Sequence, residues 1–172
     1  MKIALKKELT GSILDIGGGG EGIIGRLYGS RVTAIDNRQE ELDEAPDTCT
    51  KLCMDATALA FADESFDAAT AFYSLLFMTA REQERAIAEG IRVLRPGGRL
   101  CLWDCAVESA YPNPFVTELD VDLEGELLHT SYGICKLDAQ SRESILSFCL
   151  TKGLTLLTSR QEGIHFYLEL QK

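Results

Sequence analysis

Four consecutive glycines at positions 17–20 constrain this chain more than any other feature. They follow a short apolar run, Ile13, Leu14 and Ile16, which is typical of a buried parallel strand. Glycine adopts positive φ without strain and has no Cβ, so a glycine loop can turn sharply and let a ligand approach the backbone. The segment Ser12–Asn37 therefore predicts a strand, a glycine loop, a helix and a second strand.

The second predicted strand ends in Asp36 and Asn37. An acidic residue at this point can reach across to the glycine loop and accept both hydroxyls of a ribose, as in doubly wound α/β folds that bind nucleosides. Gly17, Gly19 and Gly22 also match G-x-G-x-x-G, which several nucleotide-binding families share. These features predict a nucleoside ligand without choosing among those families.

Asp15 narrows the choice. A carboxylate two residues before the first glycine suits a ligand with an ammonium group, whereas a pyrophosphate requires amide donors and no nearby anion. Asp15-Ile-Gly-Gly-Gly resembles the first motif, D-x-G-x-G-x-G, of class I S-adenosylmethionine-dependent methyltransferases. The third glycine of that motif falls on Glu21, with Gly22 one place later. Either the loop is displaced by one residue, or Glu21 lies in the first helical turn, where the dipole favours an anion.

The resemblance covers residues 12–104 by motif and residues 138–171 by fold pattern. The passage from Asp55 to Asp67 is similar to the family's D-A-x-x-L-P-F-x-x-x-S-F-D, and Glu89–Leu100 is similar to its passage into the fifth strand. The likeness is to the small-molecule branch typified by ubiquinone and menaquinone biosynthesis enzymes. Leu76 and Phe77 stand where many members of that branch carry a His pair.

This resemblance implies a residue for each part of S-adenosylmethionine. Asp15 would bind the amino group, Asp36 the ribose, and Asp55 the exocyclic amine of adenine. Phe72 and Tyr73 would lie beside the methionyl part. The expected cofactor-binding residues are Asp15, Gly17, Gly18, Gly19, Asp36, Asn37, Asp55, Ala56, Phe72 and Tyr73.

The implied fold class is α/β, a single Rossmann-like doubly wound sheet, mostly parallel, with an antiparallel last strand and strand order 3-2-1-4-5-7-6. Residues 154–159 and 164–170 are predicted as strands joined by the tight connection Gln161-Glu-Gly, which makes them antiparallel. The helix before the fifth strand is expected to end at Arg95-Pro-Gly-Gly.

With 172 residues, 45% of them hydrophobic, we expect one domain spanning residues 1–172. A pocket-forming insertion is expected at 105–137, where Leu119, Val121 and Leu123 alternate with acidic residues and predict a hairpin. The first ten residues are expected to be a short lead-in, either one helical turn or an extended arm, which leaves the cofactor cleft open.

The charge balance bears on location and partners. A net charge of −10 disfavours a nucleic-acid partner, because that affinity comes largely from Lys and Arg. The N-terminal residues lack the apolar stretch of a secretory leader, and no apolar run reaches membrane-spanning length. We expect a cytoplasmic protein with a small-molecule substrate and leave a homodimer open. The six cysteines lack the spacing of usual zinc sites, so no metal is expected.

The sulfonium of S-adenosylmethionine activates its methyl group, so the protein mainly has to align a nucleophile. If the acceptor holds a proton, the candidate bases are His129, in the predicted hairpin, and Tyr73, with Tyr132 as a further choice. His165 lies in a predicted strand and is expected to be structural. Asp104, at the end of the fifth strand, is expected to reach the pocket.

We therefore predict an enzyme that transfers a methyl group from S-adenosylmethionine to a small-molecule acceptor by direct in-line displacement. One alternative is an NAD(P)-binding Rossmann oxidoreductase, since the glycine pattern and Asp36 fit that fingerprint too. Another is a non-catalytic S-adenosylmethionine-binding subunit or sensor, which the short N-terminus and the missing His pair would suit.

Overall fold

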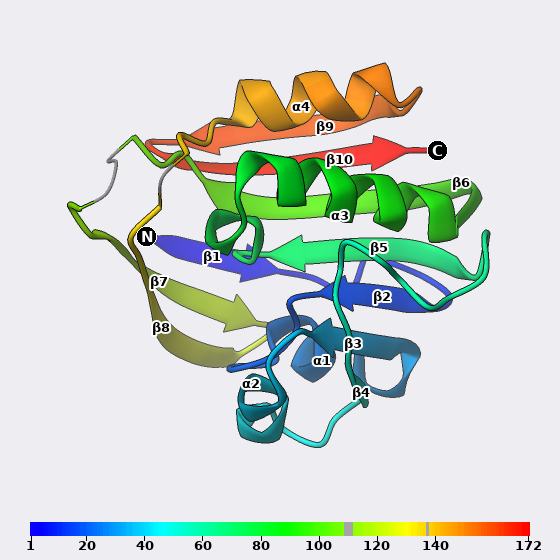
Figure 1. Cartoon of the computed structure of the whole chain (residues 1–172). Helices are drawn as coiled ribbons and strands as arrows, with labels where there is room; N and C mark the ends of the chain where they lie inside the picture. The colour runs from blue at the N-terminus through cyan, green and yellow to red at the C-terminus, as the bar shows by residue number, and fades with distance from the viewer. Residues whose placement is uncertain (109–111, 137) are drawn as a thin grey trace.

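A seven-stranded sheet forms the centre of the computed structural model, which describes residues 1–108, 112–136 and 138–172. The strands of this main sheet are β2 (Ile13–Ile16), β3 (Val32–Asp36), β4 (Thr50–Cys53), β5 (Phe66–Phe72), β6 (Leu94–Cys105), β9 (Thr155–Glu162) and β10 (His165–Gln171). They lie in the order β4-β3-β2-β5-β6-β10-β9 (Figure 1). Counted within this sheet alone, that is the expected order 3-2-1-4-5-7-6. Strand β10 is antiparallel to β6 and β9, and the other pairs are parallel.

Helices pack on both faces of the main sheet. They are α1 (Ile23–Tyr28), α2 (Gln39–Glu44), α3 (Ala80–Val93) and α4 (Arg142–Thr151), with short 3₁₀ helices η1 (Gly29–Arg31) and η2 (Leu75–Phe77). Helices α3 and α4 bury Ile87 and Ile145 in the core on one face, whereas α1 buries Ile24 and Leu27 in the core on the other. Because both faces are covered here, β5 is buried along nearly its whole length.

Helix α3 begins at a capping box formed by Thr79 and Glu82. The Thr79 side chain accepts from the Glu82 N–H, and the Glu82 carboxylate accepts from the Thr79 N–H at 2.7 Å. The helix ends at Val93, so the predicted end at Arg95 was wrong by two residues. Helical dihedral angles are disfavoured at Arg95 because a proline follows it, and the chain is already extended in β6 at this residue.

A second, three-stranded sheet lies beside the first, in the order β1-β7-β8. Its strands are β1 (Lys2–Leu5), β7 (Phe115–Leu123) and β8 (Glu126–Ile134). The predicted hairpin is present, with Leu119 opposite Thr130 and Val121 opposite Leu128. The N-terminal segment is extended, as one of the two expectations had it, but its parallel pairing with β7 was not predicted. Residues 109–111 and 137 of the expected insertion lie outside the described residues.

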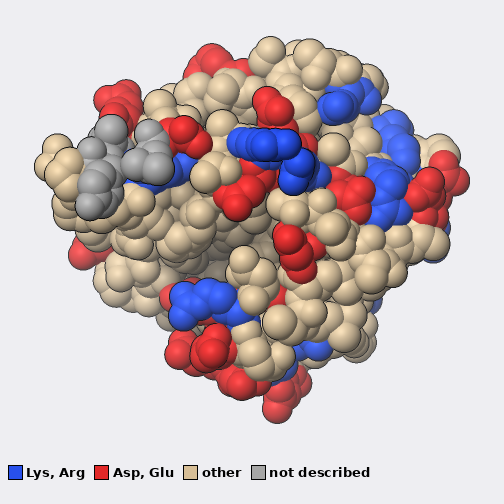
Figure 2. Space-filling view, viewed as in Figure 1, with Lys and Arg blue, Asp and Glu red and all other residues tan. Residues whose placement is uncertain are grey.

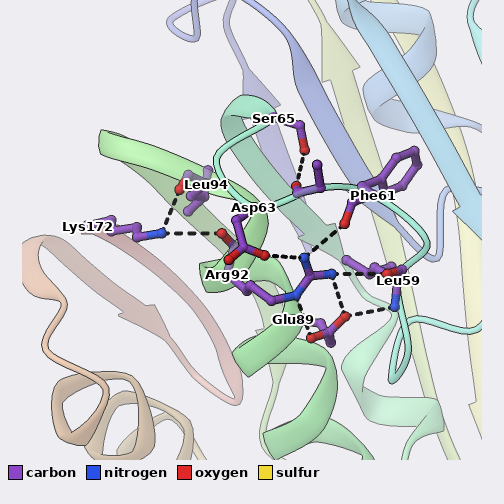
Figure 3. A network of polar contacts seen from close by, with 9 residues as sticks. Leu59, Phe61, Asp63, Ser65, Glu89, Arg92, Leu94 and Lys172 are labelled. Atoms are coloured by element: carbon purple, nitrogen blue, oxygen red, sulfur yellow. Dashed lines mark hydrogen bonds and ion pairs between the residues drawn. The ribbon is translucent and has the colours of Figure 1, made fainter.

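Arg92 of α3 fixes the loop between β4 and β5 (Figure 3). Its guanidinium donates to the backbone oxygens of Leu59 at 3.0 Å and Phe61 at 2.9 Å. It also forms ion pairs with Glu89 and Asp63, and Glu89 accepts from the Leu59 N–H at 2.8 Å. These contacts satisfy backbone groups that a loop would otherwise leave to water, so the end of α3 fixes the path of the loop from β4 to β5.

Candidate functional site

A cavity of about 870 Å³ opens where β2, β3, β4 and β5 end. All ten residues that the sequence assigned to the cofactor line it. Strand β8 adds Ser131, Tyr132 and Gly133 to the wall. The face of the molecule in Figure 2 is hollowed near its centre, with acidic and basic side chains around the hollow. Ligands of open α/β sheets bind at this edge, which makes the cavity the candidate site.

The glycine loop packs too tightly against the protein for side chains. A Cβ built on Gly17, whose φ is +71°, would lie 2.4 Å from the Cβ of Ser74, and one on Gly19 would lie 2.5 Å from the Cβ of Glu41. The N–H groups of Gly17 and Gly18 both donate to the backbone oxygen of Ile35, at 2.8 and 3.0 Å. The loop is therefore fixed between β3, α2 and η2, with its backbone facing the cavity.

Glu21 does not lie in the first turn of α1. The helix starts at Ile23, after Gly22 in the left-handed region with φ of 59°, so that alternative for Glu21 was wrong. Its carboxylate instead accepts a hydrogen bond from the Thr130 hydroxyl of β8. Arg26 donates to the backbone oxygen of Glu21 at 2.7 Å. This end of the loop is tied to the hairpin because Gly22 turns the chain before the helix begins.

Asp15 lies buried beneath the loop, with an exposed fraction of 2%. Its Oδ1 accepts from the Thr70 hydroxyl at 2.7 Å, and its Oδ2 would lie 2.5 Å from a Cβ on Gly18. Burial raises the pKa of this carboxyl from 3.8 to about 7, against the opposing effect of Thr70, and the negative charge of Asp36 adds to the rise. A positive group over Gly18 would favour the charged form.

Two further carboxylates follow the neighbouring strands. One oxygen of Asp36 accepts from the Arg38 N–H at 3.0 Å, and the other would lie 3.0 Å from a Cβ on Gly19. Asp55 accepts from the Thr57 N–H at 2.8 Å, and its hydrogen bonds with Thr57 lower the pKa of its carboxyl. Both side chains therefore offer carboxylate oxygens as acceptors to the cavity.

Tyr73 lies where β5 leaves the sheet and lines the cavity together with Phe72. Its ring stacks on Tyr132 of β8, with centroids 5.3 Å apart and planes at 11°. The Tyr73 hydroxyl is 2.7 Å from Nδ1 of His165, the first residue of β10. Burial raises the pKa of Tyr73, so its phenol keeps its proton at neutral pH.

Two other predicted residues lie away from the cavity. His129 is on β8 as expected, but its side chain is 68% exposed, pairs with Asp120 at 2.9 Å, and is absent from the cavity wall. Asp104 was expected to reach the pocket, and this was wrong. It is fully buried and accepts from the side chain of Gln140 at 2.7 Å and from the N–H of Cys105 at 2.8 Å.

Several residues of the cavity wall were not predicted from the sequence. Phe77, the last residue of η2, and Met78 directly after it line the cavity, and Glu41 lines it beside Gly19. Ser74 packs under Gly17, and its hydroxyl donates to the backbone oxygen of Ile16 at 2.7 Å. The only signal for the first two was their position just past a strand end, which gives no information on side-chain direction.

Some site types have no candidate among the described residues. Within 1–108, 112–136 and 138–172, no three His, Cys, Asp or Glu side chains are gathered as metal ligands. All six cysteines are free thiols. No helix in those ranges combines the length and apolar character that crossing a bilayer requires.

Comparison with known proteins gives named relatives. The ubiquinone/menaquinone biosynthesis C-methyltransferase UbiE of Paracoccus denitrificans is 37% identical over 101 residues, which cover 51% of this chain and 40% of that protein. The O-methyltransferase rstn1 of Aspergillus nomiae is 38% identical over 116 residues, which cover 60% of this chain and 51% of that protein. The chain thus spans about half the length of the curated relatives it matches.

Solved structures share the fold. A SAM-dependent methyltransferase from Methanosarcina mazei matches 95% of this chain and 94% of its own, with a TM-score of 0.65 and 24% identity. The model of a methyltransferase domain matches residues 14–102, from β2 to β6. Since that match covers more than half of the sequence, the chain belongs to this methyltransferase domain family.

Proposed function

We propose that this chain transfers a methyl group from S-adenosylmethionine to a small-molecule acceptor by direct in-line displacement. One observation carries the proposal. Asp15, Asp36 and Asp55, at or just past the ends of three neighbouring parallel strands, line one cavity beside the glycine loop. Membership of the methyltransferase domain family supports it.

The hydrogen-bonding groups fit the parts of S-adenosylmethionine. Within the part of the chain that the structure describes, Oδ2 of Asp36 and Oδ2 of Asp15 accept no hydrogen bond. The Asp36 oxygen suits the two ribose hydroxyls, and the Asp15 oxygen suits an ammonium group. Asp55 and the backbone of Ala56 suit the edge of adenine, at the far end of the same cavity.

The bound cofactor supplies an electrophilic methyl group next to a positive sulfur, and the chain holds and shields it. A carboxylate beside the sulfur would stabilise the ground state more than the transition state, because transfer removes that positive charge. Asp15 is suited to the amino end instead. The aromatic rings of Tyr73, Tyr132 and Phe77 form an apolar wall that excludes water from the reacting atoms.

Neither predicted base is well placed in the structure. The Tyr73 phenol keeps its proton and is hydrogen-bonded to His165, and His129 lies outside the cavity wall. This favours acceptors whose nucleophilic atom has little need of a base, such as a thiolate or an activated carbon. A catalytic role for His129 stays a prediction, for which the structure gives no support.

Binding of S-adenosylhomocysteine tests the cofactor assignment. The Asp36→Ala variant should bind about tenfold or more weakly than the wild type in isothermal titration, because it loses charge-assisted hydrogen bonds to the ribose. Asp43→Ala is the matched control, since it removes an acidic side chain of α2, the next element after β3, that lies outside the cavity wall. NADH binding in place of S-adenosylhomocysteine would support the oxidoreductase alternative and reject the proposal.

Transfer itself is tested with S-adenosylmethionine that carries a radiolabelled methyl group and a small-molecule extract. The wild type should label a metabolite, and Asp36→Ala should label much less at the same cofactor concentration. Tight binding of S-adenosylhomocysteine without any labelled product would instead favour the non-catalytic subunit or sensor.

A further inference from the structure

Tyr73 has an unusual backbone conformation for its position. Its φ is +49°, in the left-handed region that residues with a Cβ seldom adopt, and its side chain is almost completely buried. Its N–H donates to the backbone oxygen of Trp103 in β6 at 2.8 Å. Such strain persists only where surrounding contacts hold the residue in place. The contacts of the Tyr73 side chain therefore indicate what holds this conformation in place.

The Tyr73 side chain stands between two cavities. It lines the cofactor cavity, and it also lines a second cavity of about 460 Å³ between β1, α1, β6 and β10. His165 lines only the second one. The tyrosine thus spans the wall, with its hydroxyl held at 2.7 Å by the imidazole on the far side.

The charge states and acidities of the Tyr73 phenol and the His165 imidazole determine which of them donates this hydrogen bond. Burial lowers the pKa of His165 and raises that of Tyr73, so both groups are neutral near pH 7. Among the charged groups around His165, the N-terminal ammonium lowers its pKa further, and Glu162 opposes this. Of these two neutral groups the phenol is the stronger acid and the imidazole nitrogen the stronger base, which favours the phenol as donor to Nδ1, with the imidazole proton on Nε2.

We propose that His165 is a positioning residue for the cofactor cleft. Through its hydrogen bond it fixes the Tyr73 ring at the cleft wall, where Tyr132 stacks on it and seats the β7–β8 hairpin over the site. Loss of the bond leaves the ring free to rotate toward the second cavity, so the wall is no longer preorganised. The inference rests on the proposed function, since it assumes that the cleft binds S-adenosylmethionine.

Histidine NMR tests the bond without any ligand. The chain has two histidines, so ring nitrogen signals of His165 and His129 can be assigned by substitution of either one. In the wild type, His165 should be neutral near pH 7 with its proton on Nε2. Tyr73→Phe should change the His165 signals and leave those of His129, which pairs with Asp120, as an internal reference. Unchanged His165 signals would overturn the proposal.

Binding of S-adenosylhomocysteine tests the functional part. His165→Leu should weaken binding about fivefold, the effect of one lost neutral hydrogen bond. His165→Asn should stay within about twofold of the wild type, because Asn Oδ1 can accept where Nδ1 did. Tyr73→Phe should lose as much as His165→Leu, and the double variant no more than either.

Tyr167→Phe is the matched control. It also removes a phenol hydroxyl from the wall of the second cavity, but Tyr167 does not line the cofactor cavity, so affinity should be unchanged. Circular dichroism checks that each variant folds, and if His165→Leu does not, the pair Tyr73→Phe and His165→Asn gives the answer. If the wild type fails to bind S-adenosylhomocysteine, the proposed function is wrong. If it binds and neither His165→Leu nor Tyr73→Phe weakens binding, only the positioning role is wrong.

Discussion

The ends of β2 and β6 each bury a carboxylate, and the two differ in what surrounds them. Asp15 and Asp104 have exposed fractions of 2% and 0%. Burial is the largest cause of the pKa rise in both, to about 7 in each case. By pKa alone the two would be equal candidates for a functional site.

Their hydrogen bonds separate them. Asp104 accepts from the N–H of Cys105, the N–H of Leu76 and the side-chain amide of Gln140. The side-chain oxygen of Gln140 in turn accepts from Lys136 at 2.9 Å. Asp15 accepts from Thr70 within the described residues and lines the cavity. A raised pKa therefore indicates burial, whereas unused hydrogen-bonding capacity that faces a cavity indicates a binding group.

The largest expected effect is on stability at Asp104. Asp104→Ala should lower the free energy of unfolding by about 3 kcal/mol, because it leaves three buried donors without an acceptor. Urea denaturation followed by circular dichroism measures this. Asp15→Asn is the comparison, and it should change stability by less than about 1 kcal/mol, since Asn can still accept from Thr70. Equal losses in the two variants would show that both carboxylates have the same structural role.

The next effect is on ligand affinity at Asp15. Asp15→Asn should bind S-adenosylhomocysteine about tenfold more weakly, because a neutral amide cannot replace a charge-assisted hydrogen bond to the amino group. Isothermal titration at a pH near 8, where the wild-type carboxyl is ionised, gives the cleanest comparison. Undiminished affinity would show that Asp15, like Asp104, is structural.

The smallest effect is the pH dependence of that affinity. Because ammonium binding requires ionised Asp15, whose pKa is raised to about 7, the affinity should rise as pH increases through that value. From about pH 6 to about pH 7.5 the rise should be about eightfold, with proton release on binding. Asp15→Asn should show a flat profile, and a wild-type profile that is equally flat would contradict the assignment.

The same pKa shifts determine whether stability rises or falls with pH. An acid whose folded pKa lies above its unfolded value of 3.8 binds protons preferentially in the folded state between the two values. The contribution of Asp15 and Asp104 to stability is therefore largest below about pH 4 and is lost as pH rises through about 7. Bound ligand should reduce this loss at Asp15 and leave that at Asp104 unchanged.

Much of the candidate site could be predicted from the sequence because each part is local. The glycine loop, Asp36 and the Asp55-Ala56 pair each lie at the end of a strand or within a few residues after it, and parallel strands bring such ends to one edge. The hairpin was predictable for the same reason, since alternation and a glycine turn lie within one short segment.

Two errors were local, at the end of α3 and at the start of α1, and the others concern contacts between segments far apart in the chain. Nothing in the first ten residues specifies β7 as the partner of β1, because a strand edge accepts any backbone of suitable direction. The pairing of β6 with β10 decides on which side of the sheet the Asp104 side chain lies. The same pairing brings Tyr73 to His165, which is 92 positions away in the sequence.

Local patterns and the geometry of parallel strands were thus enough to predict the edge at which a ligand binds, and the resemblance to a methyltransferase family implied the strand order and the residues that line that edge. Which buried carboxylate faces the cavity, and which aromatic ring His165 holds, became clear only from the folded chain. Such outcomes are set by packing and by hydrogen bonds between distant segments, whose free energies depend on the final arrangement and leave no periodic pattern in the chain.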